Sequence, residues 1–149
     1  MYDKKITSNE PTLLILLLDQ SISMSETMTE TEQGEVYSIA KVAKIISDTF
    51  LYTAFRKCVR GDEFKPYIDL AVIGYGGSPY SRTDICSALP KISLEQFPFS
   101  VTKLADTYIA KNDSNPDDNS VPKPRLEWIE ERADGLTPTL AAFTKAREI

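Results

Sequence analysis

Two long apolar runs dominate the pattern of hydrophobic and polar positions along the chain. Residues 13–18 are six consecutive aliphatic residues that end at Asp19, and residues 67–75 form a second, mostly apolar run that ends at a pair of glycines. Runs of this length, without alternation of polar and apolar positions, are typical of strands buried on both faces in the middle of a parallel sheet. The sequence therefore predicts two buried strands.

A segment with helical periodicity lies between these strands. From about Glu35 to Lys57, apolar side chains recur at steps of three and four residues, which is the spacing of one face of an amphipathic helix. Residues 26–34, before the helix, show no apolar periodicity and are predicted to form a loop. Strand, helix and strand together make a βαβ unit with a right-handed crossover, so the predicted fold class is α/β.

The pattern is weaker in residues 79–124, which we interpret as a variable insert or an edge region of a single domain spanning residues 1–149. Residues 85–89 and 92–94 are short apolar pieces that fit an edge hairpin, and residues 99–109 have a weaker helical pattern.

Residues 111–124 are mostly Asn, Asp, Ser and Pro, which predicts an acidic surface loop. Alternating acidic and amide residues within it resemble the start of a calcium-binding loop. An EF-hand needs Gly and Glu where this chain has Asp118 and Pro124. A solvated loop is therefore the favoured interpretation.

The composition narrows the classes of function. With 149 residues, 42% hydrophobic and 26% charged, the chain is typical of one soluble globular domain. Its net charge of −5, with both signs interspersed, argues against nucleic-acid binding. The run at 13–18 is too short to cross a bilayer, which takes roughly 20 residues, and it lacks a signal-peptide pattern. We therefore expect a cytoplasmic protein without membrane contact.

Cysteine and histidine counts exclude several kinds of site. Cys58 and Cys86 have no C-x-x-C spacing, so we expect reduced thiols rather than a disulfide. The chain has no histidine, which removes the commonest zinc ligand and any Ser-His-Asp triad.

The end of the first predicted strand carries a candidate metal site, Asp19-x-Ser21-x-Ser23. Ligands in parallel sheets bind beyond the carboxyl ends of the strands, where these three side chains would bring their oxygens together. Hard oxygen ligands suit Mg²⁺ or a similar divalent cation. The alternative is an Asp/Ser turn that caps the next helix.

A second informative stretch is Gly135-x-Thr137-x-Thr139. Gly135 permits a tight turn. Thr137 followed by Pro138 is a typical helix start, with a hydroxyl cap and then proline at the first helical position. On its own, this stretch predicts only that Thr137 caps the last helix.

Taken together, in this order around the long helix, the two stretches resemble those of a von Willebrand factor A domain. The resemblance covers nearly the whole chain. It implies a Rossmann-like sheet, mostly parallel with an antiparallel edge, with flanking helices. It also implies a metal-ion-dependent adhesion site in which Asp19, Ser21, Ser23 and Thr137 hold Mg²⁺, or Mn²⁺ or Ca²⁺ in its place.

The chain departs from the family pattern at two points. Ile22 stands where the family usually has a small residue between the serines. The family also continues with another strand that ends in a site-completing Asp, whereas this chain ends at Ile149. The resemblance thus implies that the C-terminal strands are missing and that the first strand has an open edge. We expect a second copy, a partner chain or residues 79–124 to cover that edge.

The function that this resemblance implies is recognition without catalysis. One carboxylate and three hydroxyls leave a divalent cation incompletely neutralised, so a partner's Asp or Glu can complete its coordination. We therefore expect a metal-dependent adaptor or assembly module that binds a protein partner. The alternatives are a metal-free interaction module with a decayed site and, from another class, a Mg²⁺-dependent phosphoryl-transfer enzyme with Asp19 as its nucleophile.

Overall fold

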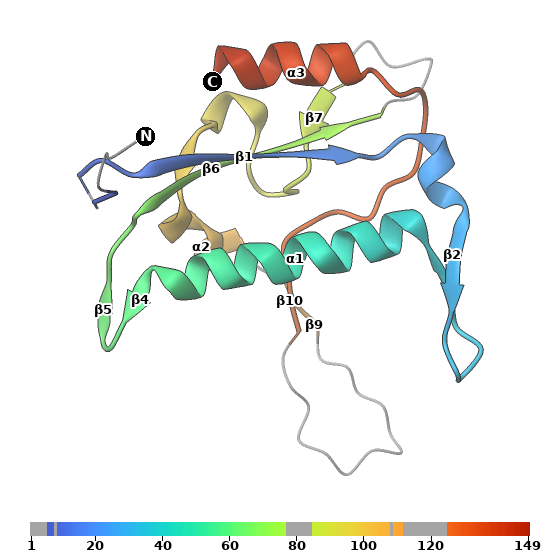
Figure 1. Cartoon of the computed structure of the whole chain (residues 1–149), viewed down its shortest axis with the longest axis horizontal. Helices are drawn as coiled ribbons and strands as arrows, with labels where there is room; N and C mark the ends of the chain where they lie inside the picture. The colour runs from blue at the N-terminus through green and yellow to red at the C-terminus, as the bar shows by residue number, and fades with distance from the viewer. Residues whose placement is uncertain (1–5, 8, 77–84, 108, 112–124) are drawn as a thin grey trace, which may run out of the picture.

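The computed structural model describes residues 6–7, 9–76, 85–107, 109–111 and 125–149. Figure 1 shows three layers, with the central sheet between α1 (Ile39–Lys57) on one face and α3 (Thr139–Glu148) on the other. Within the described residues, no helix is both long and apolar enough to cross a bilayer.

The central sheet contains both parallel and antiparallel pairs. Strand β1 (Thr12–Asp19) runs parallel to β6 (Ile68–Tyr75) over its whole length. On the other side of β6, β7 (Ile85–Ser87) and β8 (Phe99–Ser100) are antiparallel to it, at opposite ends. The predicted α/β class, with two long parallel strands and an antiparallel edge, is confirmed.

Strand β1 differs from the prediction made from its apolar pattern, because it lies at the edge of this sheet, where the resemblance implied an open edge. None of its residues is fully buried, and Leu13 is 42% exposed, whereas Leu70 to Ile73 of β6 are 0% exposed. Among the described residues, β1 pairs with β6 alone. The prediction of a central strand buried on both faces is therefore wrong. The described strands that follow residue 79 pair with β6 or with each other, so they do not cover the open edge.

Helix α1 begins at Ile39, four residues later than predicted. The Ser38 side chain caps it by accepting the Lys41 N–H at 3.0 Å. Before the cap, β3 (Val36–Ser38) is antiparallel to β2 (Thr27–Glu30). The predicted loop at 26–34 is therefore partly wrong, since much of it belongs to a hairpin.

The remaining elements are short. Only the first piece of the predicted edge hairpin is a strand, and the helical pattern at 99–109 yields one turn of α-helix. The acidic loop predicted at 111–124 lies almost entirely outside the described residues. The short elements not yet described are η1 (Ile22–Ser25), β4 (Val59–Arg60), β5 (Glu63–Phe64), η2 (Leu94–Gln96), η3 (Val101–Lys103), α2 (Leu104–Thr107), β9 (Ile109–Lys111) and β10 (Arg125–Glu127).

The main core lies between α1 and the sheet. The buried carboxylate of Asp48 anchors the segment that follows β10 to this core. Leu51 of α1, Leu70 of β6 and Trp128 belong to one buried cluster. Asp48 is 7% exposed, and its Oδ1 accepts the N–H groups of Trp128 and Ile129 at 2.8 and 2.9 Å. This contact ties the segment after β10 to α1 and directs the chain toward the carboxyl end of β1.

Candidate metal centre

The structure brings three of the four predicted ligands together at the carboxyl end of β1. The Ser21 N–H donates to Asp19 Oδ1 at 2.9 Å, and the hydroxyls of Ser21 and Ser23 hydrogen-bond each other at 3.1 Å. Ser21 is buried at 1% exposure, while Ser23 is exposed. The 3-10 turn η1 begins directly after Ser21 and holds the two serines on one side of the loop.

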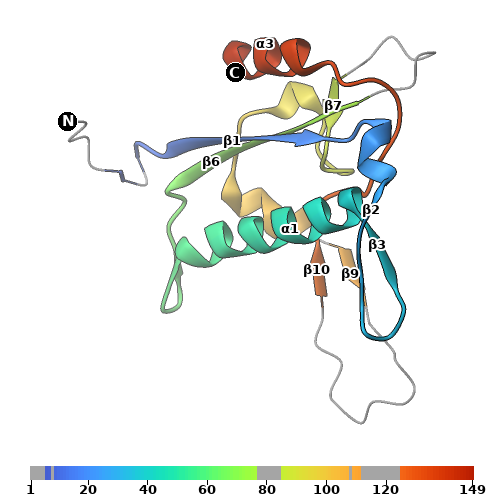
Figure 2. The ribbon, with the colours of Figure 1, turned by 45° about the vertical axis from the view of Figure 1, so that its right-hand side comes forward.

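The segment that precedes α3 lies against this loop. The Asp134 N–H donates to the Gln20 carbonyl at 2.8 Å, and the Ile22 N–H donates to the Gly135 carbonyl at 3.1 Å. Gly135 has φ +72°, a conformation that favours glycine. Figures 1 and 2 both show the chain before α3 passing beside η1. The predicted pairing of the two stretches is present at the level of the backbone.

Thr137 follows two residues after this contact and does not cap the helix. Helix α3 begins at Thr139, Pro138 occupies the capping position, and no side-chain hydrogen bond caps the end. The Thr139 N–H instead bonds the Thr137 carbonyl at 2.9 Å. The prediction that the Thr137 hydroxyl caps the helix is therefore wrong, and this exposed hydroxyl has no role in capping. No hydrogen bond found in the described residues joins it to Asp19, Ser21 or Ser23.

Gln20 positions the segments around the candidate site, and it was not identified from the sequence. It is 4% exposed, its N–H donates to the Tyr75 carbonyl at 2.7 Å, and its Nε2 donates to the Glu130 carbonyl at 3.0 Å. Gln20 thus links the ends of β1 and β6 to the segment that carries Gly135. A side chain at Gly74 would collide with Gln20 Oε1. The glycine within a strand was the one signal in the sequence for such a close approach.

Asp134, the other carboxylate near Thr137, is already engaged. Its Oδ1 lies 3.0 Å from Arg132 Nε as an ion pair, and its Oδ2 accepts from Arg132 Nη2 at 3.2 Å. This hydrogen bond raises the pKa of the Arg132 guanidinium. Arg132 also donates to Cys86 Sγ at 3.5 Å, while burial raises the pKa of that thiol. Asp134 is thus ion-paired with Arg132, although its buried Oδ1 accepts no hydrogen bond from the described residues.

The charge of Asp19 affects the pKa of Tyr75. Asp19 and Tyr75 are directly opposite each other in the β1–β6 register. Burial raises the pKa of the Tyr75 phenol, and the negative charge of Asp19 raises it further. The raised pKa therefore extends to higher pH the range in which this phenol stays neutral.

The donor set fits a hard divalent cation better than a transition metal. The candidate ligands are one carboxylate and hydroxyl groups, the oxygen ligands that Mg²⁺ and Ca²⁺ prefer. In the part of the chain that the structure describes, no group of three or more His, Cys, Asp and Glu side chains could hold a metal. Among the described residues, a cation at Asp19 would thus depend largely on hydroxyl oxygens.

Comparison with known proteins gives little further information. No family model matches the sequence, and no curated protein matches it. A crystal structure of an uncharacterized membrane-spanning protein from Vibrio fischeri is similar, with a TM-score of 0.44 and 14% sequence identity over 91% of this chain. This chain spans about half of that structure, 47% of its length. The similarity is too low to carry an argument about function.

Proposed function

We propose that the chain is a von Willebrand factor A-like domain with a Rossmann-like sheet, and that it binds a protein partner through a divalent cation. The observation that carries this proposal is the hydrogen-bonded group of Asp19, Ser21 and Ser23 at the carboxyl end of a parallel strand. The bond from Ile22 to Gly135 supports it, because it brings the Thr137 segment to the same place.

Each residue has a distinct part in this proposal. Asp19 supplies the negative charge that attracts the cation. The hydroxyls of Ser21, Ser23 and Thr137 supply neutral oxygens, which leave the cation with residual positive charge. When bound, Mg²⁺ supplies an electrophilic position for a partner's Asp or Glu carboxylate. The chain itself performs no bond-breaking step in this function.

Two exposed apolar side chains suit a protein partner. Ile22 is 66% exposed and Leu136 is 69% exposed. Ile22 is bonded through its backbone to Gly135, the residue before Leu136, so both residues belong to the two loops that form the candidate site. A protein partner that places its carboxylate here would also bury these apolar side chains, which would increase its affinity. A small carboxylic acid would bury less apolar surface and would gain less affinity.

The first prediction concerns the cation. Asp19→Ala should abolish Mg²⁺ and Mn²⁺ binding measured by calorimetry, because the variant lacks the charged ligand of the proposed site. Circular dichroism should show that the fold is retained, since Asp19 is only half-buried. Asp62→Ala is the matched control, because Asp62 is an exposed carboxylate in the turn between β4 and β5. Equal metal affinity in the wild-type and Asp19→Ala chains would refute the proposed site.

The role of the partner carboxylate is tested with acetate. Bound Mn²⁺ should speed the proton relaxation of acetate in the wild-type chain but not in Asp19→Ala, because acetate would take the position meant for a partner. Metal binding without an effect on acetate would contradict carboxylate recognition. Mg²⁺-dependent turnover of a generic phosphate ester that Asp19→Ala abolishes would favour the enzyme alternative instead.

A further inference from the structure

The open edge of β1 presents a regular row of backbone groups. The N–H groups of Thr12 and Gln20 donate to carbonyls beside β6, at 2.8 and 2.7 Å. Because alternate residues of a strand direct their N–H and C=O groups to opposite edges, the odd-numbered residues face away from β6. These are Leu13, Ile15, Leu17 and Asp19. Within the described residues, no strand pairs with this edge.

Helix α1 presents apolar side chains on the same side as this edge. Its flank with Lys44 and Asp48 meets the segment at 127–129, which lies on the β8 side of the sheet. Ile46 and Phe50 are one turn apart on the opposite flank. They are 63% and 44% exposed, so they border the open edge of β1 on this face.

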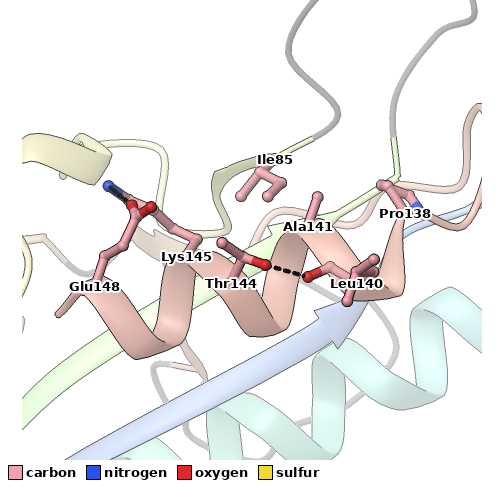
Figure 3. Close-up of a pocket in the computed structure, with 7 residues that line it drawn as sticks. All are labelled: Ile85, Pro138, Leu140, Ala141, Thr144, Lys145 and Glu148. Atoms are coloured by element: carbon pink, nitrogen blue, oxygen red, sulfur yellow. Dashed lines mark hydrogen bonds and ion pairs between the residues drawn. The ribbon is translucent and has the colours of Figure 1, made fainter.

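Helix α3 has the same arrangement on the other face of the sheet. A groove of about 550 Å³ separates α3 from Ile85 of β7, and Ala141 and Lys145 line it, as Figure 3 shows. Phe143 lies on the flank of α3 away from this groove, by helical spacing. Phe143 is 61% exposed, and by helical spacing it falls on the flank of α3 that is nearer to the β1 edge.

We propose that a second copy of this chain covers the edge, with the two β1 strands paired antiparallel about a two-fold axis perpendicular to the sheet. The occupant must be an extended strand that is apolar on both faces, because apolar side chains border the edge on both faces. Strand β1 itself meets this requirement, with no charge and no proline from Leu13 to Leu18. A two-fold axis also turns the flank of α1 that carries Phe50 toward the same flank of the second copy, and likewise the flank of α3 that carries Phe143.

The dimensions of the two layers agree with this pairing. Leu14, Leu16 and Leu18 pack with Leu51 and Leu70 in one core, so α1 lies over both β1 and β6. With strands about 4.8 Å apart, the two copies of α1 would lie roughly two strand spacings apart. That separation, about 9.6 Å, falls within the 8–10 Å or so at which helices pack.

The area and the charges are also compatible with a dimer. Eight residues of strand span about 26 Å, and three layers stack to roughly 30 Å, which gives about 800 Å² per partner, the standard size of a specific interface. Antiparallel pairing places the two Asp19 carboxylates about 23 Å apart, well beyond the Debye length of about 8 Å at physiological salt. Both carboxyl ends stay accessible, so this inference does not depend on metal binding.

The test is sedimentation of the 149-residue chain over a wide concentration range. We expect a monomer–dimer equilibrium, with Phe50→Ser weakening the dimer about tenfold or more, as for an aromatic interface residue. Tyr52→Ser is the matched control, because Tyr52 is exposed at 43% on the other flank of α1. Leu13→Lys adds charge to the edge at a residue that is already exposed, and it should give a monomer.

Each outcome decides the matter. A wild-type chain that stays monomeric throughout overturns the proposal, as does a dimer that only Tyr52→Ser disrupts. Larger, open-ended oligomers also contradict it, because a two-fold interface closes on itself. Circular dichroism of each variant confirms folding, and a dimer that persists in both folded Phe50→Ser and folded Leu13→Lys chains would place the interface elsewhere.

Discussion

Single side chains at the end of β1 respond to the charge that the site carries. Since the negative charge of Asp19 raises the pKa of Tyr75, Asp19→Asn should lower that pKa toward its usual value. A cation bound at Asp19 should act in the same direction. NMR titration of labelled tyrosine, assigned with Tyr75→Phe, measures both effects. A Tyr75 pKa that does not change in Asp19→Asn would mean that the two groups do not interact.

The same residue gives a pH dependence with a definite sign. A phenol whose pKa is raised by folding stabilises the folded chain below its unfolded pKa, near 10. That contribution is lost as the pH rises through the higher folded value. Alkaline denaturation should therefore begin at lower pH in the wild-type chain than in Tyr75→Phe, which has no group to ionise there.

Substitutions at Gly74 and Gln20 test how closely β6 approaches the segment that follows β1. Gly74→Ala should destabilise the fold by about 1–3 kcal/mol, because the new methyl group collides with Gln20 Oε1. In a Gln20→Ala background the same change should cost less, because the colliding atoms are gone. Urea denaturation of all four chains measures this coupling. Strictly additive effects would contradict the contact.

What the sequence could predict at this scale depended on local spacing. Asp19, Ser21 and Ser23 follow one another within five positions, so their meeting needs only a turn. Gln20 contacts Glu130, 110 positions away, and no local pattern marks such a contact. Thr137 was assigned to a helix cap from its neighbour Pro138, but the helix starts one residue beyond that proline.

At the scale of elements, the predictions succeeded where side-chain periodicity decides the structure. Strands β1 and β6 and most of α1 were found, because apolar side chains mark buried faces. The β2–β3 hairpin was missed because all of β2 is exposed, so it has no buried face to mark. The apolar pattern of β1 did not predict its edge position, although the resemblance to a von Willebrand factor A domain implied an open edge on this strand. A strand that is covered by helices on both faces has an aliphatic run whether or not both of its edges are paired. The run therefore does not distinguish a central strand from an edge strand.

Asp48 links two elements, and its removal should separate them. Asp48→Ala would leave the buried N–H groups of Trp128 and Ile129 without their acceptor, and Lys44 without one of its two carboxylates. We expect a loss of about 3–5 kcal/mol in the free energy of unfolding, as for a broken buried ion pair. Urea denaturation measures it, with the exposed Asp106→Ala as control. A loss no larger than that of the control would contradict the anchoring role.

At the scale of the whole molecule, the two proposals concern different parts of β1. The candidate cation site uses the carboxyl end of the strand, whereas dimerisation uses its long edge. A double experiment therefore separates them. Asp19→Ala should leave the sedimentation behaviour unchanged, and Phe50→Ser should leave the Mg²⁺ affinity unchanged. Loss of both properties in either folded variant would show that the edge and the site are coupled.

The contact of Gln20 with Glu130 across 110 positions has a consequence for synthesis on the ribosome. The Asp19 loop leaves the exit tunnel long before the segment that packs against it is translated. Parallel pairing of β1 with β6 also waits for the whole crossover helix, because its partners come from opposite ends of a βαβ unit. Throughout that interval the nascent chain exposes an unpaired aliphatic strand, the kind of segment that chaperones bind. The candidate binding site is therefore completed only after the segment around Gly135 has also left the tunnel.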